Sequence, residues 1–327
     1  MIPFYGRHQQ VAECLSALLA QKLSHTQFLL VDDGSHPAGA DCEMLKPYLE
    51  RQDVTLITHP ENSGVSAARN SAIHWCRERD IKILLMIDSD CRPGAKVIEE
   101  HLRLHIQHPG AACIGGSIIG TGRSAWAKLD GLVSWIHASP HNRADSSQPE
   151  FRYVAAPYHL ASTNFSVKIS LLPERERVFD ERLKTGEDCL LVRQLRQQKR
   201  EVYFSATPSV YHQDRERLAD VFRHHYAWGH HQYFIQLGGD LSPRCFNPIY
   251  RLAFASIFLL LLPLFALTGA LLNSKALWAN QRQKLWWFPA IYLLWLAKGC
   301  AVLEAALRPY ACLRQQRPQI SYHSHRP

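Results

Sequence analysis

The sequence has no Cys-x-x-Cys pair, although its 327 residues include nine cysteines. Scattered cysteines, odd in number, argue against a disulfide framework and a zinc site and favour a reducing compartment. No zinc-finger, helix-turn-helix or RNP-type pattern is present, so we expect no nucleic-acid partner. The opening stretch MIPFYGRHQQ lacks the apolar run of a signal peptide, which favours a cytoplasmic main body. Internal repeats and low-complexity tracts are also absent.

The composition is that of a globular protein with a basic surplus. Hydrophobic residues make up 46% of the chain and charged residues 20%, which excludes a disordered chain. The formal net charge is +8, with an isoelectric point of about 9.0. A surplus of this sign indicates anionic partners such as nucleotides, phosphates or an anionic membrane surface.

The first 120 residues alternate short apolar runs with helical stretches. We expect strands at 26–35, 53–60, 81–90 and 111–120, and helices at 8–22, 41–51, 64–79 and 94–107. Alternation of this kind predicts the α/β class, with a mainly parallel sheet wrapped by helices. In such sheets the ligand crevice lies beyond the carboxyl ends of the strands.

The stretch from about 121 to 237 is mixed in character. It contains a polar loop at 139–150, and its other expected elements are helices at 124–138 and 214–236, short strands near 151–156 and 201–211, and a helix that begins within TGEDCLLVRQLRQQ. We therefore treat 1–237 as one domain, in which the regular alternation of about 1–120 gives way to the mixed pattern of about 121–237.

The remainder, 238–327, has the composition of a membrane region. The segment 252–272 carries no charge and has the length of a bilayer-crossing helix, which makes a buried soluble helix the weaker interpretation. The segment 285–307 contains Lys298 and Glu304, and it is either a second span or one arm of an interfacial hairpin. The flanking basic residues weakly favour a cytoplasmic position for both the main domain and the tail.

Carboxylates follow two of the expected strands. VDDGS places Asp32 and Asp33 at a strand end, where they offer acceptors for a nucleobase or simply form an ordinary turn. ILLMIDSD places Asp88 and Asp90 on one face of an extended segment, so both can converge on one hard cation such as Mn²⁺ or Mg²⁺. A lone Asp-x-Asp triplet is a weak signal, because many turns contain one.

Two helix starts carry further charged residues. HPENSGVSAARN brings Arg69 into the first turns of a helix, where it can reach a diphosphate or remain solvated. KTGED opens another helix with Glu187 and Asp188. The helix dipole alone favours acids at that position, but a carboxylate facing the crevice is also a candidate general base.

Taken in order, VDDGS, ENSGVSAARN, IDSD and TGED strongly resemble the family 2 glycosyltransferases, in their membrane-anchored bacterial form. The resemblance covers residues 1 to about 230. It implies a GT-A fold, which is a Rossmann-like αβα sandwich, over 1–237. The donor half would be about 1–120 and the acceptor half about 121–237, followed by C-terminal transmembrane helices at about 252–272 and 285–307.

The resemblance also implies site roles. Asp188 would be the catalytic base, and the donor-binding set would be Asp32, Asp33, Arg69, Asp88 and Asp90. Asn164 and Glu187 would lie on the acceptor side. A Mn²⁺ or Mg²⁺ ion would be bound by Asp90, Asp88 and His212, although a histidine buried at a strand end is an equally good interpretation of His212.

The implied reaction is transfer of one sugar, with inversion, from a nucleotide-diphosphate sugar to a hydroxyl of a lipid-linked or cell-envelope glycan. A UDP-sugar is the expected donor. The Q-x-x-R-W signature of processive synthases is missing, and two spans are too few for a polymer channel. We expect the bacterial inner membrane as location, with the catalytic domain in the cytoplasm.

The start of the chain departs from the family pattern. Most of the first apolar strand is missing before PFYGR, and Gly6 replaces the usual Asn. This departure keeps a catalytically inactive, membrane-anchored nucleotide-sugar binder as an alternative. Among enzymes, the alternative is a polyprenyl-phosphate glycosyltransferase, whose acceptor needs little help from a base. A nucleotidyltransferase fits poorly, because PFYGRHQQ is not the Gly-rich basic loop that it requires.

Overall fold

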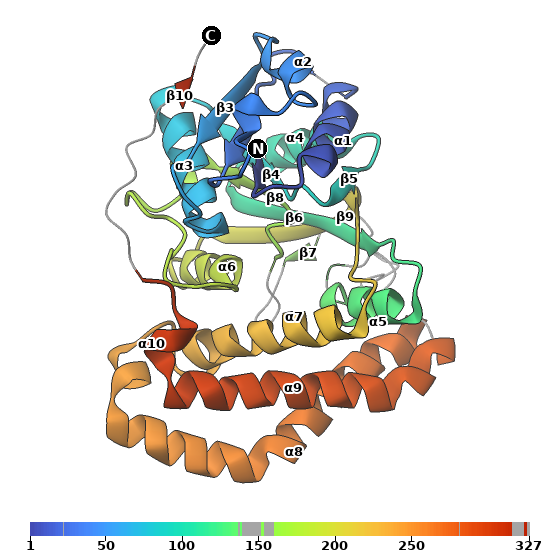
Figure 1. Cartoon of the computed structure of the whole chain (residues 1–327), viewed down its shortest axis with the longest axis vertical. Coiled ribbons are helices and arrows are strands. Elements are labelled where there is room, and N and C mark those ends of the chain that lie inside the picture. The colour runs from blue at the N-terminus through green and yellow to red at the C-terminus, as the bar shows by residue number, and fades with distance from the viewer. Residues whose placement is uncertain are drawn as a thin grey trace.

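The computed structural model describes residues 1–21, 23–136, 138, 152–153, 160–280, 282–315 and 324–325. An upper α/β domain sits on a base of long helices (Figure 1). The strands are β1 Ile2–Phe4, β2 Phe28–Asp32, β3 Val54–Thr58, β4 Ile83–Ile87, β5 Cys91–Pro93, β6 Ala111–Gly120, β7 Arg152–Tyr153, β8 Asn164–Lys168, β9 Glu201–His212 and β10 Ser324–His325. The helices are α1 His8–Leu19, α2 Lys46–Leu49, α3 Val65–Glu78, α4 Val97–Gln107, α5 Ala125–Ser134, α6 Glu187–Gln197, α7 Leu218–His231, α8 Pro248–Asn280, α9 Phe288–Leu307 and α10 Pro309–Cys312.

The first strands form a parallel sheet in the order β1-β2-β3, with β10 added antiparallel to β3. The first strand has only three residues, Ile2, Pro3 and Phe4, which pair in register with β2. The backbone of Met1 continues the contact to β4, because Ile87 N donates to its carbonyl at 3.1 Å. The first strand is therefore short but in its expected place, between β2 and β4.

The second sheet is mixed and runs in the order β4-β8-β6-β9-β5, with β7 paired to β9. β8 is antiparallel to both β4 and β6, whereas β6 and β9 are parallel. The prediction of an α/β fold with four early strands is confirmed. The sheet is less uniformly parallel than the alternation indicated, because β8 enters from the second half of the chain.

The helices around the donor half agree with the apolar periodicity, apart from one. α1, α3 and α4 fall within the expected stretches. The helix expected at 41–51 is only a single turn, α2, which follows a short 3-10 segment at Gly39–Asp41. Pro47 explains the late start of α2, because proline is tolerated in the first turn of a helix but not in its interior. The polar loop expected at 139–150 lies outside the described residues.

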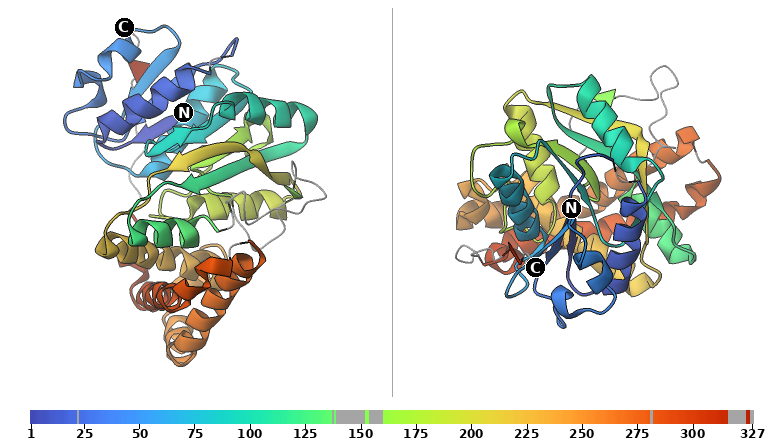
Figure 2. Two further views of the ribbon diagram at one scale, coloured as in Figure 1. Left: turned by 90° about the vertical axis from the view of Figure 1, so that its right-hand side faces the viewer. Right: turned by 90° about the horizontal axis from the view of Figure 1, so that it is seen from above.

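The helices of the second half lie on the side of the sheet that faces the base. α5 begins at Ser124, whose hydroxyl accepts from Ala127 N at 3.0 Å. α7, expected within 214–236, is followed by a π-helical turn at Gln232–Leu237. α7, α9 and α8 form successive layers below the sheet (Figures 1 and 2).

Two stretches, Pro248–Lys275 and Leu285–Leu307, are long and apolar enough to cross a membrane. All nine cysteines are free, as expected.

Candidate active site

The predicted residues Arg69, Asp88 and Glu187 meet in one buried ion-pair group. Arg69 projects from α3 and is only 2% exposed. Its Nη2 donates to Asp88 Oδ1 at 3.0 Å, and its Nη1 donates to Glu187 Oε1. Since Asp88 follows β4 and Glu187 opens α6, one guanidinium joins the donor half to the acceptor half.

The electrostatics of this group are set by burial and by the close carboxylates. Burial disfavours the charged form of Arg69, but Asp88 and Glu187 raise its pKa above the ordinary value. Burial raises the pKa of Glu187 to about 7, and the charge of Asp188 acts in the same direction. Burial and the charge of Asp188 therefore oppose the ionisation of Glu187, whereas the positive charge of Arg69 favours it.

Asp188 is held in place by donors from two directions. Its Oδ2 accepts from the backbone N and the hydroxyl of Ser162, at 2.9 and 3.0 Å. Its Oδ1 accepts from Cys189 N at 2.7 Å, within the first turn of α6. The side chain is half-buried, so its carboxylate is oriented without being sealed from solvent.

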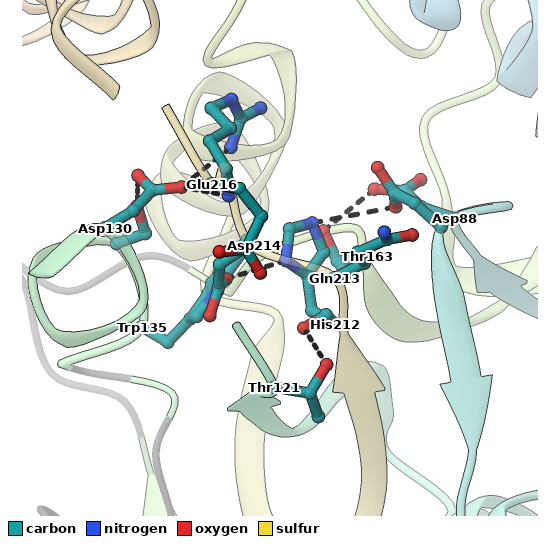
Figure 3. Close-up of polar contacts among 12 residues, drawn as sticks. Asp88, Thr121, Asp130, Trp135, Thr163, His212, Gln213, Asp214 and Glu216 are labelled. Carbon is teal, nitrogen blue, oxygen red and sulfur yellow. Dashed lines mark hydrogen bonds and ion pairs between the residues drawn. The ribbon is translucent and has the colours of Figure 1, made fainter. Parts of the chain in front are cut away.

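His212 lies between two carboxylates at the end of β9. Its Nδ1 is 2.9 Å from Asp214 Oδ1, which also accepts from Trp135 Nε1 at 2.9 Å. Its Nε2 is 3.6 Å from Asp90 Oδ1. Figure 3 shows the imidazole between Asp214 on one side and the strand end that carries Asp88 on the other. Burial works against the charged imidazole, but the hydrogen bond to Asp214 and the charge of Asp90 raise its pKa above the ordinary value.

Asp90 and His212 form a pair of potential ligands for a divalent cation. Two ligands that are each about 2.1 Å from one ion are separated by roughly 3 to 4 Å, which matches the distance between Asp90 Oδ1 and His212 Nε2. Asp214 gives His212 the carboxylate partner that metal-binding imidazoles usually have. Arg7 Nη1 lies 3.0 Å from the other oxygen of Asp90, and 61% of the Arg7 side chain is exposed. The Asp90–His212 pair therefore fits a metal such as Mn²⁺.

Asp88 is placed less directly for such an ion. Its Oδ2 accepts from Thr163 Oγ1 at 2.8 Å, while its Oδ1 accepts from Arg69. The side chain remains 28% exposed, although both of its oxygens already have donors.

The Asp-Asp pair after β2 organises the surrounding loops. Asp32 is fully buried, and its two oxygens accept from Ser35 N at 2.9 Å and Gly39 N at 2.6 Å. Asp33 accepts from Ser63 N at 3.0 Å and from Gly64 N at 2.7 Å. The two carboxylates therefore fix the loops after β2 and β3.

Asn164 does not reach the crevice. Its side chain is fully buried, and Nδ2 donates to Ser117 O and Pro208 O, both at 3.0 Å. Its Oδ1 lies 2.9 Å from His101 Nε2 on α4. The structure thus places Asn164 inside the sheet, next to Thr163, which does face the site.

Several residues of the site had no distinct signal in the sequence. His59 is buried, with Nδ1 2.8 Å from Asp33 Oδ1, so it helps to hold that carboxylate. Ser162, Thr163, Asp214 and Trp135 contact predicted residues but belong to no recognisable motif. Of these, Asp214 was the most accessible to sequence reasoning, because it stands two residues after His212 in YHQD.

The fold is that of the GT-A glycosyltransferases, as solved structures and a family profile indicate. The profile described as Glycosyl transferase family 2 matches residues 1–159. A mannosyltransferase, PcManGT from Pyrobaculum calidifontis in complex with GDP-Man and Mn²⁺, superposes with a TM-score of 0.57 at 15% identity, covering 94% of this chain and 86% of that one. The S. aureus TarS 1–349 structure with UDP gives a TM-score of 0.53 at 15% identity, covering 94% and 90%.

Curated relatives give the same class. The uncharacterised glycosyltransferase EpsJ of Bacillus subtilis (strain 168) is 32% identical over 77 residues, which are 24% of this chain and 22% of that protein. The putative glycosyltransferase EpsH of the same organism is 28% identical over 90 residues, or 25% of its length. The chain therefore matches about a quarter or less of the length of these relatives. Residues 1–159 thus match the family 2 glycosyltransferase profile, and the relatives that share sequence with this chain are named as glycosyltransferases.

The loop after β2 gives a first test of how the site is built. Gly34 has φ +79°, and a Cβ there would lie 2.4 Å from the backbone carbon of Glu61. We expect Gly34→Ala to lower the free energy of unfolding by about 1 to 3 kcal/mol, because both the left-handed backbone and the clash disfavour a side chain. Gly6→Ala is the matched control, since Gly6 has φ +63° but nothing within 4 Å of its Cβ. The free energies of unfolding of wild type and both variants would be measured by urea titration. An equal loss in Gly34→Ala and Gly6→Ala would contradict this reasoning.

The raised pKa of Glu187 predicts a pH dependence of stability. Between pH 4.5 and about 7 the folded protein keeps a proton that the unfolded chain has released, so stability falls as the pH rises through this window. Glu187→Gln removes this contribution, which is on the order of 2 to 3 kcal/mol. The free energy of unfolding, measured at pH 5, 6, 7 and 8, should therefore change less with pH in the variant than in wild type. Glu78→Gln, at an exposed position, should keep the wild-type slope, and an unchanged slope in Glu187→Gln would refute the assignment.

Proposed function

We propose that the protein transfers a single sugar, with inversion, from a nucleotide-diphosphate sugar to a hydroxyl of a lipid-linked or cell-envelope glycan. The observation that carries this proposal is the arrangement at the end of β4. There the Asp90–His212 pair borders the crevice, and the Arg69 group connects the same strand end to the start of α6, where Asp188 is held. A cation site for a diphosphate and an oriented carboxylate are the two requirements of such a transfer.

Asp90 and His212 would hold the divalent metal, with Asp88 beside them. When bound, that metal would neutralise charge on the departing diphosphate. Asp33 and the loop that it holds would shape the nucleobase pocket, and a UDP-sugar is the donor to test first. The solved neighbours support this choice of ligand class, because one is bound to UDP and another to GDP-Man with Mn²⁺.

Asp188 would accept the proton of the acceptor hydroxyl. Donors from Ser162 and Cys189 orient its carboxylate. A base on the face opposite the leaving group supports a single displacement, and such a displacement inverts the anomeric carbon. The same opposed arrangement underlies inversion in glycosidases.

We further propose that 1–237 acts as the catalytic domain and 238–327 as a membrane region, at a bacterial inner membrane with the catalytic domain in the cytoplasm. The apolar stretches in α8 and α9 support association with a membrane. They also favour a lipid-linked acceptor, and so they keep a polyprenyl-phosphate acceptor as the second candidate function.

The donor site can be tested by thermal shift of the purified protein in detergent. UDP, GDP, CDP and dTDP would each be added with and without Mn²⁺, at concentrations up to about a hundred times the Kd. Binding at that ratio stabilises the fold by about 2.7 kcal/mol. We expect one nucleotide to raise the melting temperature in a metal-dependent manner, and we expect Asp90→Asn to abolish that dependence. Asp41→Asn, an exposed substitution outside the site, is the control, and no shift with any nucleotide would contradict the proposal.

The proposed base separates the two acceptor classes. For transfer to a hydroxyl, Asp188→Asn should lower kcat by about 10²- to 10⁴-fold, while the nucleotide-dependent thermal shift remains. For transfer to a polyprenyl phosphate, the rate should be nearly unchanged, because that acceptor is already ionised. Ser162→Ala, which loses one of the donors to Asp188, should give a smaller loss. A product of retained anomeric configuration, read by proton NMR, would exclude the single displacement.

A further inference from the structure

The two apolar helices lie along the catalytic domain instead of extending away from it. In Figure 1, α9 runs beneath α7, and α8, which is bent and contains Pro263, lies beneath α9 along its first part. α9 packs against α7 over most of its length. At Gly229 of α7 a Cβ would lie 2.2 Å from Lys298 O, so the two backbones touch there.

The polar residues of α9 face α7. Glu304 Oε2 accepts from Tyr226 Oη at 2.9 Å and lies 2.8 Å from His230 Nε2. Lys298 is 4% exposed, and its Nζ lies 5.4 Å from the centre of the Trp228 ring. The charges that make α9 a poor membrane span are therefore accommodated by contacts with the catalytic domain.

α7 itself does not belong in hydrocarbon. Arg223 and Asp220 lie on its solvent side, with side chains 76% and 41% exposed. If α9 crossed a bilayer, it would either bring these charges into the lipid or break its contacts with α7. Both outcomes are costly, so the docked arrangement is not compatible with a transmembrane α9.

α8 presents a continuous apolar face on the side away from α9. It has 33 residues, which corresponds to about 50 Å, more than one span needs. Its exposed face includes Leu252, Ile257, Leu260, Leu264, Leu267 and Leu271. The opposite side packs on α9 and contributes Ala255, Phe258 and Ala266 to the buried core. A face of this size and shape matches a lipid layer.

The rim of this face has the residues of a membrane interface. Trp278, Trp286 and Tyr310 are 58%, 67% and 72% exposed at the helix ends. Exposed basic side chains accompany them, namely Arg244, Lys275 and Arg308. Aromatic and basic residues around an apolar face match the headgroup level of an anionic leaflet.

We propose that α8 and α9 lie flat in one leaflet, as an in-plane seat for the catalytic domain, and do not cross the bilayer. The inference rests on the membrane association proposed above and specifies its geometry. Through α7 these helices are also connected to the helix that carries Asp188, since the hydroxyl of Thr185, just before that helix, lies 3.2 Å from His231 Nδ1.

Cysteine accessibility in sealed proteoliposomes tests the topology. Cys300 is the single exposed cysteine of the nine, so Cys300→Ala provides a background with little reactivity. Lys275→Cys would report on the end of α8, and Arg200→Cys would report on the catalytic domain, since both positions are exposed. Labelling with a membrane-impermeant maleimide is measured in three conditions: with intact vesicles, with vesicles opened by a pore-forming toxin, and in detergent.

The in-plane seat predicts that the cysteines at positions 275 and 200 react from the same side of intact vesicles. If position 275 reacts only after the pores open, α8 crosses the bilayer and the proposal is wrong. Reaction only in detergent would place position 275 in hydrocarbon and would equally overturn it.

Flotation with vesicles that contain phosphatidylglycerol separates this proposal from the one on which it rests. Wild type and Ile106→Glu, a change at an exposed apolar residue on α4, should float, and Leu260→Glu/Leu264→Glu should not. Failure of the wild type to float would reject membrane association itself, independently of the nucleotide-dependent thermal shift.

Discussion

The guanidinium of Arg69 is the interaction on which the arrangement of the site depends. It is buried at the contact between the two halves of the domain, where it pairs with Asp88 at the end of β4 and with Glu187 at the start of α6. Loss of one partner from a buried ion pair generally costs about 3 to 5 kcal/mol, because the other charge stays buried without compensation. The pairs therefore fix α6, and with it Asp188, relative to the strand end that carries Asp88 and Asp90.

The remaining geometry builds on this connection. β8 enters between β4 and β6 and brings Ser162 and Thr163 to the two carboxylates, Asp188 and Asp88 respectively. β9 returns beside β6 and ends at His212, where Asp214 orients the imidazole toward Asp90. The Asp90–His212 pair and the proposed base Asp188 thus come from different strands and helices but share one framework of buried polar contacts.

The base of the molecule is coupled to the same framework. α7 follows directly from the His212 segment, and His231 at its end lies against Gly186. α9 in turn is fixed to α7 through Glu304 and Lys298. The apolar helices α8 and α9 are thereby connected through α7 to the residues just before Asp188.

The sequence by itself determined the α/β class, the early strands, and the motif order that resembles the family 2 glycosyltransferases, because apolar periodicity and strand-end motifs are local properties of the chain. It also identified Arg69, Asp88, Glu187 and Asp188 as site candidates. Only the tertiary structure decided that Arg69 pairs with carboxylates, that Asn164 is buried in the sheet, and that α9 turns Lys298 and Glu304 toward α7. These outcomes depend on partners between 19 and 118 residues away, and local sequence patterns carry no information about such contacts.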